Sequence, residues 1–228
     1  IAVEGADACA VLNRLCANDV DVPAGTLVYT AMLDERGRFA SDLTVLRLAE
    51  DRYRLITGTA QRIRDLWHVR RAAAGRACTV EDVTAETAVL SVMGPSSRAM
   101  LAPLVDADLD AFPFGAVRDV GLGLAARVTY VGELGWELHV PAAAAPGVLE
   151  ALIAAAPEHG GRLAGHYAIN SLRLEKAYRP TRRRSRPASA SPSRGTSRAG
   201  SSAARRCSRR GVRRRPSGSS RSRPPTRA

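Results

Sequence analysis

Short segments in which apolar and polar side chains alternate, separated by tight turns, most strongly restrict how this chain can fold. Residues 26–33 alternate in this way, residues 34–37 have the composition of a turn, and residues 39–48 alternate again. Two alternating segments joined by a short turn form an antiparallel hairpin. Further strands are predicted over residues 53–56, 78–83, 86–92, 114–121 and 125–131. The sequence therefore predicts sheets that are mainly antiparallel.

Helical periodicity, with apolar residues recurring every three or four positions, occurs between these strands. Residues 5–16 show this pattern, with Ala8, Val11, Leu12 and Leu15 on one face. Further helices are predicted over residues 59–73, 96–104, 143–155 and 165–179. Strands and helices alternate irregularly, with hairpins as well as crossovers. This order predicts an α+β fold of antiparallel sheets with packed helices.

The composition changes abruptly after Arg179. Residues 180–228 hold 16 of the 34 basic residues and none of the 22 acidic ones, so residues 1–179 carry 18 basic against 22 acidic side chains. The formal charge of +12 therefore comes from an Arg/Ser/Pro-rich tail that cannot bury a core and is expected to be disordered. Two domains are predicted: a folded part, 1–179, and the tail, 180–228.

Residues 127–141 are predicted to fold back as two short strands, with Gly132 and Gly135 on either side of the turn. Glu133 lies at the tip of this turn. A carboxylate fixed by a rigid turn is suited to accept paired N–H donors from the edge of a heterocycle or a guanidinium. The alternative is an ordinary solvated turn glutamate.

Asp42 stands inside an otherwise apolar strand, on one face with Ala40 and Thr44, while Leu43 and Val45 take the other. A carboxylate in this position either faces water or lines a cleft, where its pKa would be raised. The pattern alone leaves both possibilities open.

Several other classes of site lack support in the sequence. The cysteines and histidines have no metal-binding spacing, and the Gly121-Leu-Gly123 segment lacks the rest of a dinucleotide fingerprint. No secretory signal or membrane-spanning run is visible. A cytoplasmic enzyme is the expectation, and its first domain is expected to be incomplete at the N-terminus.

Taken in order, several segments resemble the folate-binding aminomethyltransferase domain, the fold of the glycine-cleavage T-protein. The sequence motifs at residues 41–45, 112–115 and 171–179 are most similar to those of the folate-binding domain that follows the flavin domain in dimethylglycine and sarcosine dehydrogenases. The similarity covers residues 5–179, and the segments read YTAMLDERGRFASDLTV, ITGTA, MGPSSR, FPFGAVRDVG, YVGELGWELHVP and GHYAINSLRLEKAYR.

The resemblance implies tetrahydrofolate as cofactor, bound in a central cavity, and transfer of a one-carbon unit that forms 5,10-methylenetetrahydrofolate. Asp42 matches the catalytic carboxylate near folate N10, and Glu133 matches the glutamate that pairs with the pterin edge. Tyr29 and Tyr130 match aromatic positions near the cavity. Arg173 is a further candidate ligand, with an ion pair to an acidic neighbour as the structural alternative.

The implied partners are folate, a small amine as one-carbon donor, and a flavin dehydrogenase domain or other glycine-catabolism subunits. FAD is expected only in a domain outside this chain. The sequence also departs from the family pattern: Gly37–Arg38 stands where Gly-Gly is usual, and Tyr167 and Ile169 occupy the candidate places of an arginine. These departures leave the anchoring of folate open.

Two further functions stay open at this point. One is a folate-binding paralogue that acts in assembly or repair without transfer. The other, less favoured, is nucleic-acid binding through the arginines of the tail.

The tail can also be interpreted as the product of a frameshift. If residues 180–228 are written as GC-rich codons and translated in a shifted reading frame, the result resembles a linker and the start of the C-terminal β-barrel domain of this family.

Overall fold

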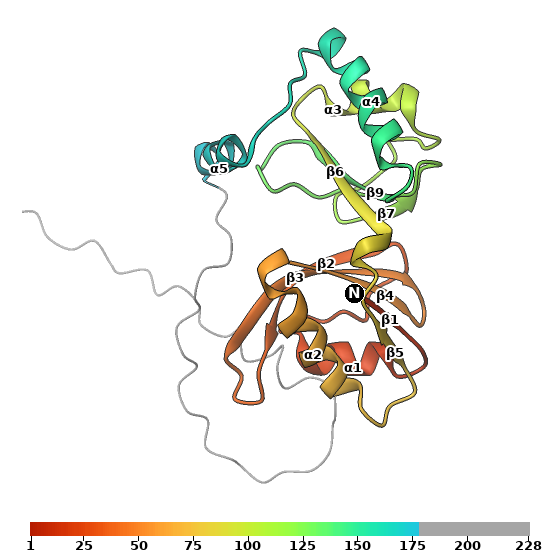
Figure 1. Cartoon of the computed structure of the whole chain (residues 1–228), viewed down its shortest axis with the longest axis vertical. Coiled ribbons are helices and arrows are strands. Elements are labelled where there is room, and N and C mark those ends of the chain that lie inside the picture. The colour runs from red at the N-terminus through yellow and green to blue at the C-terminus, as the bar shows by residue number, and fades with distance from the viewer. Residues whose placement is uncertain (178–228) are drawn as a thin grey trace, which may run out of the picture.

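The computed structural model describes residues 1–177 of the chain, so the predicted tail lies outside the described residues. Two antiparallel sheets, each backed by helices, make up the described part (Figure 1). The predicted α+β class is confirmed. No helix among residues 1–177 is long and apolar enough to cross a bilayer.

The first sheet has five strands in the order β2-β3-β4-β1-β5. Its strands are β1 (Ala2–Glu4), β2 (Thr26–Leu33), β3 (Phe39–Ala49), β4 (Arg52–Thr57) and β5 (Thr79–Glu81). The predicted hairpin is present, because β2 and β3 pair from Thr26↔Arg47 to Leu33↔Phe39. Gly37 has φ +69° in the turn between them, a conformation that glycine adopts without strain.

Helices α1 (Ala8–Leu15) and α2 (Arg62–Ala73) cover one face of this sheet (Figure 1). The four apolar residues predicted to face inward from α1 are all buried. Three of them, Ala8, Leu12 and Leu15, pack with residues of the sheet in one core that includes Leu43, Val45 and Leu55. Every second residue of β3 faces this core, so Asp42 and Thr44 lie on the opposite face.

The second sheet has four strands in the order β6-β9-β8-β7. Its strands are β6 (Thr87–Met93), β7 (Val117–Asp119), β8 (Leu124–Ala126) and β9 (Gly135–Pro141). Helices α3 (Ser97–Leu101) and α4 (Ala145–Ala155) pack with it around the fully buried Trp136. Four 3-10 helices join these elements: Thr59–Gln61, Thr84–Glu86, Ala102–Leu104 and Ala156–His159.

The two sheets meet at their edge strands, β2 and β7. The Leu27 N–H donates to the Gly115 carbonyl at 2.8 Å, and the Val117 N–H donates to the Gly25 carbonyl at 2.7 Å. A small core of residues from both sheets closes the junction: Leu27, Leu46, Val117 and Ala126. Since Leu46 and Asp42 share one face of β3, the face that carries Asp42 is the one that turns toward the second sheet.

The predicted strand over residues 125–131 is wrong in its second half. β8 ends at Ala126, and the segment 127–134 is a loop that leads to β9. The backbone of Arg127 pairs with Gly115 and Ala116, and the Thr129 hydroxyl then accepts the Val131 N–H at 3.2 Å. The alternation of Val128 and Tyr130 imitates a strand, but these contacts turn the chain away from the sheet.

Helix α5 (His166–Glu175) is the last described element, and it matches the predicted helix over residues 165–179 as far as the description extends. None of its residues is buried. Figure 1 shows it set apart from α3 and α4. Its contacts are therefore those of its side chains with neighbouring loops, which the next subsection describes.

Candidate functional site

A hollow of about 340 Å³ opens on the second sheet, at the loop between β8 and β9. Its volume lies at the lower end of the range for ligand pockets. Eight residues line it: Phe114, Arg127, Val128, Thr129, Gly132, Glu133, Leu134 and Gly135. The wall therefore combines one carboxylate, one guanidinium and an aromatic ring.

Two glycines position the carboxylate of Glu133 on this wall. Gly132 has φ +78°, which lets the loop turn sharply. At Gly135 an added Cβ would lie 2.7 Å from the Val92 carbonyl oxygen, so only glycine permits the close approach of β9 to β6. The predicted bracketing of Glu133 by these glycines is present, in a loop longer than the predicted turn.

Helix α5 supplies a cation to this carboxylate. The Lys176 ammonium, just past the last residue of α5, lies 2.8 Å from Glu133 Oε1. The hydrogen bond and charge of Glu133 raise the pKa of Lys176 above its ordinary value. One turn earlier, the Arg173 guanidinium lies over the Tyr130 ring, 5.7 Å from its centroid. Glu133, Tyr130 and Arg173 are thus brought together, three of the five predicted site residues.

The other two predicted residues meet on the first sheet. The Tyr29 hydroxyl donates to Asp42 Oδ2 at 2.6 Å. Ala31 lies opposite Asp42 in the register of β2 and β3, so Tyr29 is its diagonal neighbour on the same face. The prediction that the Tyr29 ring packs near a ligand ring stays a prediction, and the hydrogen bond of its hydroxyl adds a contact that orients the Asp42 carboxylate.

A buried network holds the strand behind Asp42. The Ser41 and Thr57 hydroxyls donate to Asp65 Oδ2 of α2, at 2.7 and 2.5 Å, and only 1% of Asp65 is exposed. These bonds tie β3 and β4 to α2 on the face opposite Asp42. Buried networks in which every group has a partner make a segment rigid.

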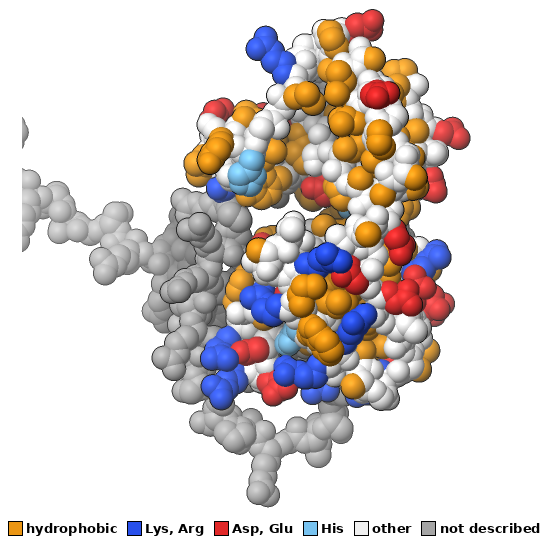
Figure 2. Space-filling model, in the orientation of Figure 1, with side chains coloured by type: hydrophobic (Ala, Val, Ile, Leu, Met, Phe, Trp, Pro, Cys, Tyr) orange, Lys and Arg blue, Asp and Glu red, His pale blue; other side chains and the backbone are white. Residues whose placement is uncertain are grey.

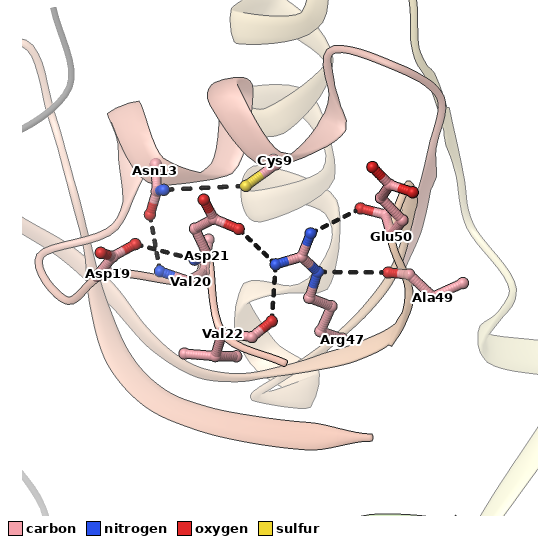
Figure 3. Close-up of polar contacts among 9 residues, drawn as sticks. All are labelled: Cys9, Asn13, Asp19, Val20, Asp21, Val22, Arg47, Ala49 and Glu50. Atoms are coloured by element: carbon pink, nitrogen blue, oxygen red, sulfur yellow. Dashed lines mark hydrogen bonds and ion pairs between the residues drawn. The ribbon is translucent and has the colours of Figure 1, made fainter. Parts of the chain in front are cut away.

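Farther along β3, Arg47 joins the strand to the loop before β2 (Figure 3). Its guanidinium contacts the Asp21 carboxylate and donates to the carbonyls of Val22, at 2.7 Å, and Glu50, at 3.0 Å. In the same view, the Val20 N–H donates to the Asn13 side chain of α1 at 2.7 Å. Both ends of the strand that carries Asp42 are therefore fixed by polar contacts.

The two predicted carboxylates border the same junction between the sheets, but they do not share the hollow. Val128 lines the hollow and also packs on the junction core with Leu27 and Leu46. Asp42 lies on the same face of β3 as Leu46 of this core, but it does not line the hollow. The roles assigned to Asp42 and Glu133 therefore stay predictions.

A second polar group, not predicted from the sequence as a site, lies between the sheets. His139 Nε2 is 3.9 Å from Glu137 Oε2, and Arg54 of the first sheet donates to the Thr87 hydroxyl at 3.5 Å. Burial, reinforced by the charge of Arg54, lowers the pKa of His139 to about 4. Burial raises the pKa of Glu137. The imidazole is therefore neutral near pH 7.

The geometry defines a two-sheet domain with a carboxylate-bearing hollow, and sequence comparison gives its family. The chain belongs to the GCVT N-terminal domain family, whose sequence model matches residues 1–187. This confirms the resemblance predicted from the sequence. The family comprises enzymes of the aminomethyltransferase and sarcosine dehydrogenase type.

Two relatives show the range of this similarity. The chain is 41% identical to the mitochondrial sarcosine dehydrogenase of Mus musculus, over 77% of this chain and 21% of the relative. It is 36% identical to the aminomethyltransferase of Thermus thermophilus, over 77% of this chain and 51% of the relative. The chain thus spans about a fifth of the first relative and about half of the second.

A solved structure supports the same conclusion. The glycine cleavage system aminomethyltransferase T from Bartonella henselae matches with a TM-score of 0.70 and 27% identity, over 78% of this chain and 48% of that chain. The antiparallel two-sheet arrangement described above is therefore the aminomethyltransferase fold.

Two residues at the hollow were not predicted. Phe114 lines the wall of the hollow and is 64% exposed. The aromatic-Pro-aromatic-Gly motif at residues 112–115 could have identified it as a candidate site residue. Lys176 is the only lysine of the chain. No local pattern links it to Glu133, 43 positions earlier, so its contact could not be found from the sequence.

Proposed function

We propose that this domain binds tetrahydrofolate at the hollow and serves one-carbon transfer that forms 5,10-methylenetetrahydrofolate. The observation that carries the proposal is the Glu133 carboxylate on the wall of a hollow, in a chain of this family. A reduced pterin presents two parallel N–H donors along one edge, and a carboxylate is the complementary acceptor. Phe114, which is 64% exposed on the wall, and Tyr130, which is 42% exposed beside it, offer aromatic surface for the rings.

In this proposal Asp42 acts as the base. Bound tetrahydrofolate supplies two amines, N5 and N10, that take up the one-carbon unit. Transfer from an iminium donor forms two C–N bonds to folate and breaks the bond between the carbon and the donor nitrogen. Of the two N–H protons lost, one leaves with the amine product and one goes to a base. The Tyr29 hydroxyl at 2.6 Å orients Asp42 for this role.

Binding of tetrahydrofolate to the full chain under anaerobic conditions, measured by calorimetry, tests the first half of the proposal. Glu133→Gln is expected to weaken binding about 10- to 100-fold, because it replaces a charged acceptor by an amide that can accept at only one atom. The matched control is Glu158→Gln, an exposed glutamate in the same half of the molecule. Equal affinity of the wild type and Glu133→Gln would remove Glu133 from the site.

The second half is tested with Asp42→Asn. With formaldehyde as the one-carbon source, the rate above the uncatalysed reaction is expected to fall by about 100-fold or more, because general bases contribute factors of this size. The Kd for tetrahydrofolate is expected to change less than threefold. An equal loss in rate and affinity would make Asp42 a ligand and not a base.

One observation favours the second candidate function, a folate-binding paralogue without transfer. The lining of the hollow contains Glu133 but not Asp42. Folate binding without any methylenetetrahydrofolate formation would establish this alternative. Nucleic-acid binding would depend on residues 180–228, which lie outside the described residues; an intact reading frame across codon 179 in the gene would be needed to support it.

The proposed partners follow from the relatives. The chain spans about a fifth of the sarcosine dehydrogenase it matches. We propose that FAD is bound, and the amine donor oxidised, by a flavin domain that is not part of this chain. A cytoplasmic location remains our expectation, although that relative is mitochondrial in Mus musculus.

A further inference from the structure

Side chains at the C-terminal end of helix α5 contact the loop of the candidate site. None of its ten residues is buried, and Tyr167 and Leu174 are 90% and 66% exposed. Figure 2 shows the α5 region beside, not within, the packed body of the second sheet and its helices. A helix without a buried apolar face takes little stability from packing. Its position therefore depends on the few side-chain contacts that it makes.

Two of those contacts reach the loop that carries the candidate ligand residues. Lys176 Nζ lies 2.8 Å from Glu133 Oε1, and the Arg173 guanidinium lies over the Tyr130 ring. Both partners belong to the segment 127–134, which forms most of the hollow. The group proposed to hold a pterin is thus also the group that holds α5.

From this geometry we infer that Lys176 competes with the ligand for Glu133 and is a specificity-determining residue of the hollow. The inference rests on the proposed function. A carboxylate binds a flat pair of donors through both oxygens, and Lys176 holds one of them with a point charge. The ligand must therefore displace the ammonium or accept a single hydrogen bond.

The strength of the ion pair makes displacement feasible. Half of the Lys176 side chain and about a third of the Glu133 side chain are exposed. Ion pairs of such exposure are weak. Two coplanar N–H donors of a 2-amino-4-oxo heterocycle are therefore expected to displace the lysine, whereas a heterocycle without the 2-amino group is expected to leave it in place.

The test uses the full chain, anaerobic tetrahydrofolate as probe and calorimetry as readout. Lys176→Met keeps the length of the side chain and removes its charge, and it is expected to tighten binding about 3- to 10-fold. This gain in affinity must disappear when Glu133 is also replaced, so the double variant Lys176→Met/Glu133→Gln is expected to bind with the same Kd as Glu133→Gln alone. The control Arg14→Gln removes an exposed charge from α1, on the far side of the first sheet, and is expected to leave the Kd unchanged.

Hydrogen exchange of residues 166–175 gives a second readout. Without ligand, Lys176→Met is expected to exchange faster than the wild type in this segment, and tetrahydrofolate is expected to produce the same change in the wild type. Unchanged or weaker binding by Lys176→Met, while the wild type still binds, would overturn the competition and leave the proposed function intact. Absence of binding in every variant would overturn both, while the exchange of the ligand-free variant would still report whether Lys176 holds α5.

Discussion

The strand that carries Asp42 and the loop that carries Glu133 place their carboxylates in opposite ways. β3 is paired with β2 on one side and β4 on the other, and Asp65 ties it to α2 from behind. The loop 127–134 is turned by Gly132 and held from outside by a helix without buried residues. Asp42, the group proposed for chemistry, is therefore held rigidly before any ligand binds. Glu133, the group proposed for recognition, lies on a loop whose supporting helix can move more easily.

The two halves also differ in the origin of their rigidity. The first sheet lies on two helices, and its polar groups are linked by networks such as those of Asp65 and Arg47. The second sheet is organised around one large side chain, Trp136, which meets the Phe112 ring edge-on at 6.3 Å between centroids. The loop with Glu133 leads directly into the strand that carries this tryptophan.

The largest expected effect would come from removing that tryptophan. Trp136 is fully buried, so Trp136→Ala is expected to lower the free energy of unfolding by about 3–5 kcal/mol, from lost burial and the cavity left behind. Urea unfolding followed by circular dichroism checks the value. The matched control is Trp67→Ala, because Trp67 is 64% exposed and its loss is expected to change stability by less than about 0.5 kcal/mol.

The same variant sharpens the comparison of the two halves. If the joined edges of β2 and β7 make one cooperative unit, hydrogen exchange in β3 is expected to accelerate together with exchange in β9. Acceleration in β9 alone would show that the halves unfold separately. A loss of less than about 1 kcal/mol would contradict the view that Trp136 organises the second sheet.

The next effect concerns the polar group between the sheets. The pKa of His139 is lowered to about 4, from about 6.5 in an unfolded chain, so the unfolded state binds more protons between these values. The contribution of this imidazole to stability is therefore present above pH 6.5 and is lost as the pH falls toward 4. At pH 4.5 the loss is about 2 to 3 kcal/mol.

Urea unfolding of the wild type and of His139→Gln, at pH 7 and pH 4.5, isolates this contribution. The raised pKa of Glu137 acts in the opposite direction, since a carboxyl that binds its proton more tightly in the folded state gains stability as the pH falls. Glu137 is present in both proteins, so the difference between them reports the imidazole. A difference that does not change with pH would show that His139 is not desolvated between the sheets.

Much of the fold could be predicted from local patterns. The strand at Thr26–Leu33 agrees with its prediction to the residue, since strict alternation and a glycine turn leave few alternatives. The alternation within β3 also placed Asp42 on the face opposite Leu43 and Val45, and the structure shows that the helices pack on the Leu43 side. The prediction of a strand over residues 127–131 was wrong. The backbone of Arg127 pairs with residues 115–116, and such pairing depends on where a segment distant in the sequence lies.

Less of the candidate site could be predicted. The resemblance marked Asp42 and Glu133, and the pairing of Tyr29 with Asp42 follows in principle from the hairpin register. The contact of Lys176 with Glu133 depends on how α5 lies against the loop, which neither periodicity nor turn chemistry determines. Local patterns therefore give the face on which a side chain lies, and tertiary packing gives its partner.

The smallest effect on stability is expected for Tyr29→Phe, the change that most directly tests a carboxylate fixed in advance. The variant removes the hydroxyl that donates to Asp42 and keeps the ring. The hydrogen bond is exposed, so the free energy of unfolding is expected to fall by less than about 1 kcal/mol. If Tyr29 orients the base, the rate of methylenetetrahydrofolate formation should fall several-fold while the Kd for tetrahydrofolate stays unchanged, because a carboxylate that points the wrong way accepts the proton less often.

The matched control is Tyr167→Phe, at a ring that is 90% exposed on α5, and it should change neither the rate nor the Kd. A loss of affinity without a loss of rate would instead place the Tyr29 ring against the ligand, as first predicted from the sequence, and the contrast between a fixed strand and an adaptable loop would then no longer separate chemistry from recognition.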